Sequence, residues 1–80
     1  MEKFRVKKEW IKDLRKRHRI TQQKLSESLF EVRLGQISEW ESGRRNMPGV
    51  IWWAILLTWE KIDIWEEEGM EEFLKRYGKD

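Results

Sequence analysis

The residues of this 80-residue chain that can do chemistry are cationic and amide side chains, and we find no catalytic constellation. The carboxylates at residues 66–68, Glu71 and Glu72 form a charge run without a His, Ser or Cys partner. A solvated helix face is the plain interpretation of that run. His18 is the only histidine and cysteine is absent, which leaves too few ligands for a histidine or thiolate metal site. We therefore expect no enzyme activity, no metal and no cofactor.

The charges are unevenly divided along the chain. Residues 1–48 carry 13 Lys/Arg against 7 Asp/Glu, a net of +6, whereas residues 49–80 carry 4 against 8, a net of −4. A basic front half and an acidic tail suit a protein that faces a polyanion on one side only. Two ordinary solvated faces explain the same counts equally well, so charge alone does not decide between these explanations.

Two short amphipathic segments joined by a turn form the most informative pattern. Thr21 is a good N-cap for a helix that places Leu25 and Leu29 inward. The second segment has Ile37 and Trp40 on one face, and it ends at a glycine, which can adopt the left-handed cap conformation. A helix-turn-helix has this layout, with one helix across the DNA backbone and the next in the major groove. The pattern predicts a DNA-binding core at about residues 21–43.

The rest of the sequence indicates a single all-α domain over residues 1–80, because no stretch alternates with the period of a half-buried strand. The helices are expected at about residues 6–17, 22–29, 33–42, 49–61 and 63–77. Asp63 and Glu66 form an acidic variant of the capping box that would open the last helix, and Gly69 is a point at which that helix can divide. This last helix would serve as a cover or as a dimerisation element.

The longest apolar run, residues 50–57, is eight residues, whereas a membrane span needs about 20. Residues 1–8 contain no apolar stretch that could act as a signal peptide. We therefore expect a cytoplasmic protein without a membrane partner, associated with the nucleoid, or in the host cytoplasm if the source is viral.

From residue 11 to residue 57 the chain resembles the lambda-repressor/Cro-like helix-turn-helix family, also called Xre-type. The resemblance rests on Leu14-Arg15, Ile20-Thr-Gln22, Leu25, Leu29, Ile37-Ser38, Trp40-Glu-Ser-Gly43, Arg44-Arg45, Pro48 and the apolar helix that follows. It implies a five-helix DNA-binding bundle, here with an extra C-terminal helix, whose third helix reads bases. It also implies a sequence-specific regulator of transcription that binds double-stranded DNA, a Cro/C1-type repressor by default, of phage or prokaryotic origin.

The resemblance places the base-reading face at Arg33, Leu34, Gln36 and Glu39. Arg can pair with guanine and Gln with adenine, while Leu can touch a thymine methyl and Glu can accept from cytosine. Arg33 could equally bind phosphate, and Glu39 could repel phosphates or balance Arg44.

Contacts to the DNA backbone are implied for Gln22, at the start of the second helix, and for Ser42, Arg44 and Arg45 after the third. The plain alternatives are a solvated first-turn residue and a solvated loop. Arg15 and Glu41 match a structural ion pair that ties the first helix to the third in this family.

The chain departs from the family in the turn before the third helix. Leu29 to Ile37 spans eight steps where the family usually has seven, and Phe30 stands where a glycine is usual. The usual Ser/Thr cap of the third helix is missing. Gly35 then falls inside the reading helix, which costs roughly 1 kcal/mol relative to Ala.

Six tryptophans are more than so small an interior can hide. We expect some of Trp52, Trp53, Trp59 and Trp65 at a contact between two copies, because aromatic residues are enriched at interfaces. A two-fold dimer would present two reading helices about 34 Å apart. In the alternative, the tail helix covers them in a monomer. An alternative function is a protein-interaction adaptor that uses this Trp-rich half, antitoxin-like with a toxin partner or binding RNA polymerase.

Overall fold

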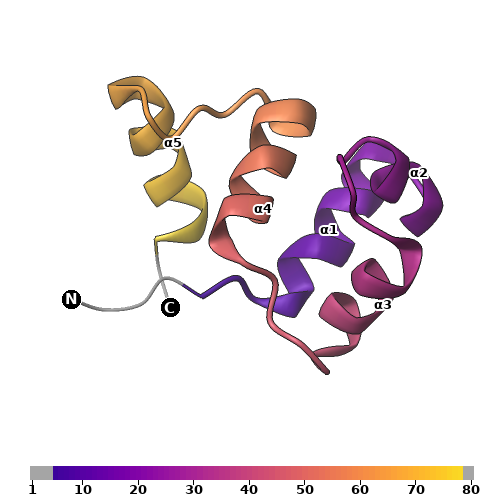
Figure 1. Cartoon of the computed structure of the whole chain (residues 1–80). Helices are drawn as coiled ribbons and strands as arrows, with labels where there is room; N and C mark the ends of the chain where they lie inside the picture. Colours follow the sequence, from indigo (N-terminus) through magenta and orange to yellow (C-terminus); the bar gives the residue numbers. More distant parts are fainter. Residues whose placement is uncertain (1–4, 79–80) are drawn as a thin grey trace.

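The computed structural model describes residues 5–78, and every regular element in that range is helical, as predicted. The elements are α1 (Lys8–His18), α2 (Gln22–Glu27), α3 (Leu34–Ser42), α4 (Gly49–Ile55), the π-helical η1 (Leu56–Glu60) and α5 (Glu67–Tyr77). Figure 1 shows α1, α2 and α3 together on one side of α4, and α5 on the other. Residues 1–4 lie outside the described residues. They make up half of the segment, residues 1–8, in which we expect no signal peptide.

The first two helices are shorter than predicted. Lys7 has an extended backbone, so α1 begins two residues late, and Val6 enters the core as extended chain. Thr21 caps α2 as predicted, since its hydroxyl oxygen accepts from the Lys24 N–H at 3.0 Å. The helix ends at Glu27 because the Ser28 hydroxyl donates to the Leu25 carbonyl at 2.7 Å and competes with the backbone ladder.

The last helix begins four residues later than predicted, and the expected capping box is absent. Asp63 instead forms a turn, in which its carboxylate accepts from the Trp65 N–H at 3.0 Å and its carbonyl accepts from the Glu66 N–H at 3.1 Å. Gly69 does not divide α5. A Cβ on Gly69 would lie 1.8 Å from the Asp63 carbonyl oxygen, so glycine is required there by this close approach.

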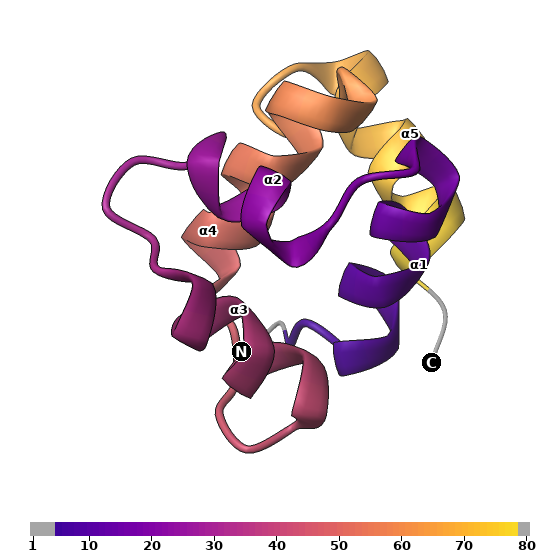
Figure 2. The same ribbon diagram turned by 90° about the vertical axis from the view of Figure 1, so that its right-hand side faces the viewer.

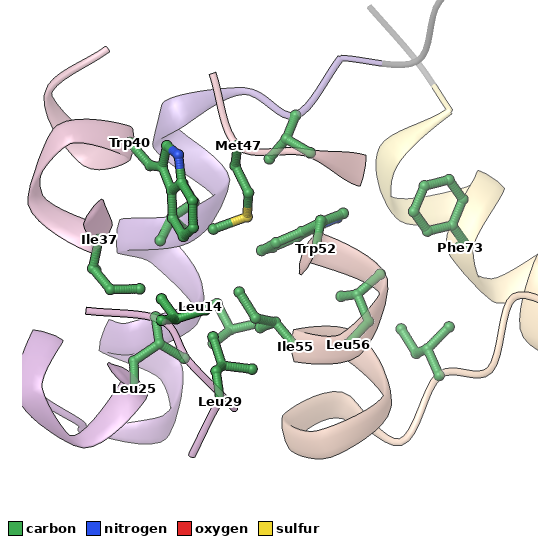
Figure 3. Close-up of a cluster of buried hydrophobic side chains, with 14 residues drawn as sticks. Leu14, Leu25, Leu29, Ile37, Trp40, Met47, Trp52, Ile55, Leu56 and Phe73 are labelled. Atoms are coloured by element: carbon green, nitrogen blue, oxygen red, sulfur yellow. The ribbon is translucent and has the colours of Figure 1, made fainter. Parts of the chain in front are cut away.

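The core forms where the first four helices meet. Figure 3 shows Leu14 of α1, Leu25 of α2, Ile37 of α3 and Ile55 of α4 converging on one apolar cluster. All four side chains are fully buried. Burial of this kind supplies most of the driving force for folding, at about 1.5–3 kcal/mol for each large side chain. This cluster holds α3 against α1 and α2.

The apolar helix α4 is only partly covered. Trp52 is 1% exposed and packs against both Trp10 and Tyr77, with ring centroids 5.8 and 5.4 Å away. Trp52 therefore has no surface left for a contact between copies, which corrects that expectation. Trp65 is 75% exposed, and it meets the half-buried Trp53 edge-on at 5.5 Å. Thus α5 covers one side of α4 and leaves another open.

Trp59 of η1 makes one hydrogen bond and one ring contact with residues of the first half of the chain. The indole N–H of Trp59 donates to the Ser28 hydroxyl at 3.0 Å, and its ring lies 5.7 Å from that of His18. The half-buried Trp59 therefore already has partners within its own chain. A helix with a widened turn can place consecutive side chains at angles that a regular α-helix does not provide.

Glu60, the last residue of η1, joins α1 to α5. Its carboxylate contacts Arg17 at 3.1 Å and His18 at 2.7 Å, and it also accepts from Arg76. Burial alone would raise the pKa of Glu60, but the hydrogen bonds from His18 and Arg17 outweigh that effect, and the pKa is lowered. Within residues 5–78, no helix has the length and apolar content that crossing a bilayer demands.

Candidate nucleic-acid interface

The third helix lies at the surface with one face in the core. Ile37 and Trp40 are buried, and they anchor α3. No Ser or Thr caps α3, and the contact is made from within the helix, because the Gln36 side-chain oxygen accepts from the Arg33 N–H at 2.9 Å. Arg33 thus becomes the N-cap residue, and α3 begins at Leu34. Figure 2 looks onto α2 and α3 at this surface.

The residues expected to read bases lie on α3 and at its N-cap, largely in contact with solvent. Arg33, Leu34 and Gln36 are exposed, and Glu39 is half-buried. Residues advance by about 100° in an α-helix, so position 35 lies roughly opposite Ile37. Space in front of Gly35 is open, since a Cβ there would meet no atom within 4 Å. The outer surface of α3 can therefore approach a large flat or grooved partner closely.

Two exposed side chains beside this face were missed by sequence reasoning. Ser38 is exposed on α3, and Phe30, in the turn before it, is 90% exposed. Glu31 follows Phe30 with a φ of 57°, in the left-handed region, and the Ser26 hydroxyl donates to the Val32 carbonyl at 2.6 Å. The longer turn is thus tied to α2 and presents Phe30 to solvent. The replacement of the usual glycine by Phe30 was the sequence signal for this feature.

The loop after α3 is ordered by hydrogen bonds around Ser42. Its hydroxyl donates to the Glu39 carbonyl at 3.0 Å and accepts from the Arg44 N–H at 3.3 Å. Gly43 has a φ of 83° and ends the helix in the left-handed conformation, as predicted. The guanidinium of Arg45 lies 3.4 Å from the carboxylate of Glu39, so Glu39 balances Arg45 and not Arg44. Both arginines are exposed.

Cations from the start of the chain join this loop. One surface hollow is lined by Arg5, Lys7 and Lys8 together with Arg45. The Lys8 side chain packs against Gly43, whose Cβ position would be 3.0 Å from the Lys8 Cδ. The basic character of residues 1–8 was visible in the sequence, but its place beside the end of α3 was not.

Arg15 and Glu41 form the ion pair that the family resemblance implied. The guanidinium donates from Nε to Oε2 at 2.5 Å and from Nη2 to Oε1 at 2.8 Å. Gln22, expected to bind phosphate, donates its side-chain amide to the same carboxylate at 3.2 Å. Burial would raise the pKa of Glu41, but the hydrogen bonds from Arg15 and Gln22 lower it on balance. The hydrogen bond to Glu41 raises the pKa of Arg15.

Exposed arginines and Gln36 occupy this surface around α3. Among residues 5–78 no group of three His, Cys, Asp or Glu side chains is arranged to hold a metal ion. Comparisons with protein-family models, curated proteins and solved structures found no match to this chain.

Proposed function

We propose that this chain is a sequence-specific regulator of transcription that binds double-stranded DNA, with α3 in the major groove, and that it represses by blocking polymerase. The proposal rests on one observation. The exposed face of α3 is bordered at its C-terminal end by cations from two separate segments, Arg44 and Arg45 after the helix and Lys7 and Lys8 at the start of α1. In helix-turn-helix proteins of the lambda-repressor type, one helix reads base edges in the major groove while other parts of the domain contact the DNA backbone.

We expect the two parts of this surface, α3 and the flanking cations, to contact different parts of the DNA. Side chains on α3, with Arg33 and Gln36 first, would contact base edges, whereas the flanking cations would contact phosphates and fix the position of the helix. Phe30 and Leu34 add apolar surface beside Arg33, which suits thymine methyl groups. Gln22 already donates to Glu41, so its contribution to phosphate binding would come from its backbone N–H.

Selection of bound duplexes from a random DNA pool tests the proposal most directly. We expect enrichment of one short motif, and binding to that motif that weakens steeply as salt rises. A palindromic motif would add a two-fold dimer, and a single half-site would indicate a monomer. Recovery of no motif, together with no mobility shift on any duplex at moderate salt, would reject the proposal.

The second candidate is a protein-interaction adaptor, antitoxin-like or polymerase-binding, that uses the Trp-rich half. The exposed Trp65 beside an apolar groove favours it. The two candidates differ in a gel shift with genomic fragments. A specific shift supports the regulator, whereas absence of a shift with tight binding of a toxin or of polymerase supports the adaptor.

A further inference from the structure

A groove between α4 and α5 has no part in the proposed DNA contacts. It has a volume of about 450 Å³, and its lining is almost entirely apolar. Pockets that bind ligands typically have volumes of about 300–1,000 Å³. The lining includes Val50 and Trp53 of α4, Ile64 and Trp65 of the connection, and Met70 and Phe73 of α5. Since Val50 is 62% exposed and Trp65 is 75% exposed, the groove opens to solvent along its length.

One indole nitrogen beside the groove lacks a hydrogen-bond partner within the described part of the chain. The indole nitrogen of Trp53, which lines it, is buried and has no hydrogen-bond acceptor among residues 5–78. A buried donor without an acceptor is unfavourable, because it has lost its hydrogen bonds to water. This cost belongs to the fold of the chain, because an atom shielded from water is also out of reach of an occupant of the open groove.

The rim of the groove is acidic on the α5 side and uncharged on the α4 side. Helical spacing places Glu67, Glu71 and Leu74 on the same face as Met70, and all four side chains are exposed. Arg76 lies on the opposite flank of α5, where it pairs with Glu60. The sequence of α4 contains no charged residue. Lys75, also exposed, lies four residues after Glu71 and neighbours it, so Glu67 at the N-terminal end of α5 is the carboxylate on this face without a neighbouring cation on these two helices.

We propose that this groove binds an amphipathic helix of a partner protein, with an apolar stripe flanked by Lys or Arg. Apolar anchors at helical spacing fit a groove of this kind. The flanking cations would meet Glu67. A two-fold contact between copies of this chain through the same groove would instead bring the carboxylates of both copies together, which is unfavourable. The proposal uses no residue of α3 and is independent of DNA binding.

Synthetic peptides of about four helical turns test the proposal on the full chain. The first has Leu at the stripe positions and Lys at the flanking ones. The second replaces each Lys by Glu, and the third has the composition of the first with its stripe scrambled. The readout is the set of indole N–H resonances in a two-dimensional ¹H–¹⁵N NMR spectrum. We expect the first peptide alone to bind, with shifts of Trp53 and Trp65 and none of the distant Trp40.

Two variants with matched structural cost sharpen the test. Glu67 and Glu68 both lie in the first turn of α5, so replacement of either by Lys has the same unfavourable interaction with the helix dipole. They point to different sides of the helix. Glu67→Lys should weaken binding of the basic peptide about five-fold, and Glu68→Lys less than about two-fold.

Several outcomes would overturn the proposal. Equal binding of the acidic and basic peptides would remove the role of the carboxylates, and equal effects of the two variants would do the same. Peptide-induced shifts confined to other tryptophans would place the site elsewhere. Shifts of Trp53 and Trp65 that depend on protein concentration without peptide would assign the groove to a second copy of the chain.

Discussion

Arg15 and Glu41, 26 positions apart, form a bidentate ion pair that joins α1 to α3. The side chain of Glu41 is 5% exposed and that of Arg15 is 18% exposed, so the pair is largely shielded from water. The Arg15 guanidinium also donates to the Ile20 carbonyl at 3.2 Å, which ties in the connection to α2. One guanidinium thus holds the relative positions of the three helices that form the candidate DNA-binding surface.

Removal of one partner of this pair should destabilise the fold strongly. We expect Arg15→Ala to lower the free energy of unfolding by about 3 kcal/mol, because it leaves the Glu41 carboxylate buried without its counter-charge. Urea denaturation measures the change. Glu72→Ala, which removes a surface ion pair with Arg76, is the control and should cost less than about 0.5 kcal/mol. Similar costs for the two variants would contradict the structural role of Arg15.

Acid should destabilise the protein through Glu41 and Glu60. Both carboxyl groups have a folded-state pKa below the ordinary value of about 4.3. Each therefore contributes stability that is fully present above that value and is lost as the pH falls through the lower folded-state pKa. We expect the free energy of unfolding to decline below about pH 4. In urea titrations at a series of pH values, Glu41→Gln should show a shallower decline, and a decline parallel to that of the unchanged protein would exclude this linkage.

Two glycines inside helices should respond oppositely to the same substitution. Gly35→Ala places its methyl group in open space, so it should stabilise α3 by up to about 1 kcal/mol, or raise the melting temperature by about 4–8 °C. Gly69→Ala drives a methyl group into the Asp63 carbonyl, and it should destabilise by about 1–3 kcal/mol. Thermal unfolding followed by circular dichroism compares them. Effects of the same sign would contradict the packing described here.

If α3 reads bases, variants at the surface should divide into two classes. Arg44→Ala should weaken binding to every sequence and lower the salt dependence by about one unit. Gln36→Ala should relax the preference at a few base positions at a cost of about 1–3 kcal/mol. Competition gel shifts with the selected motif and with point variants of it separate these effects. Lys75→Ala on α5 is a charge-matched control that should change neither. Uniform losses for Arg44→Ala and Gln36→Ala alike would reject the assignment of α3.

The Glu39–Arg45 pair makes a further prediction for DNA affinity. Glu39→Gln removes a carboxylate from the proposed interface and releases the Arg45 guanidinium, so binding to non-cognate duplex should tighten. Glu71→Gln changes the net charge equally but lies on α5, and it should leave that affinity unchanged. Fluorescence anisotropy with a labelled duplex measures both, and equal gains would show a general charge effect only.

Local signals in the sequence were sufficient for the helices and for several of their ends. Apolar spacing identified the buried faces of α2 and α3, because that spacing follows from the pitch of a helix and not from its neighbours. Thr21 and Gly43 marked helix ends for the same reason, since a cap acts on the backbone within one turn. The candidate site residues on α3 came instead from the family resemblance, and their contacts with DNA stay a prediction.

Other features depended on contacts between distant segments. Asp63 and Glu66 have the composition of a capping box, yet the approach of Gly69 to the Asp63 carbonyl moves the start of α5 past them. Tryptophan composition could not separate the buried Trp52 from the exposed Trp65, because both occur in apolar sequence surroundings.

The sequence alone determined that this is a helical chain with a predicted helix-turn-helix and an uneven charge, because periodicity, caps and composition are local properties. Only the tertiary structure decided that Lys7 and Lys8 lie beside Arg45, that Glu60 pairs with cations from α1 and α5, and that an apolar groove stays open beside α4. These features arise where elements far apart in the chain pack together. Their positions depend on packing angles that no single segment specifies.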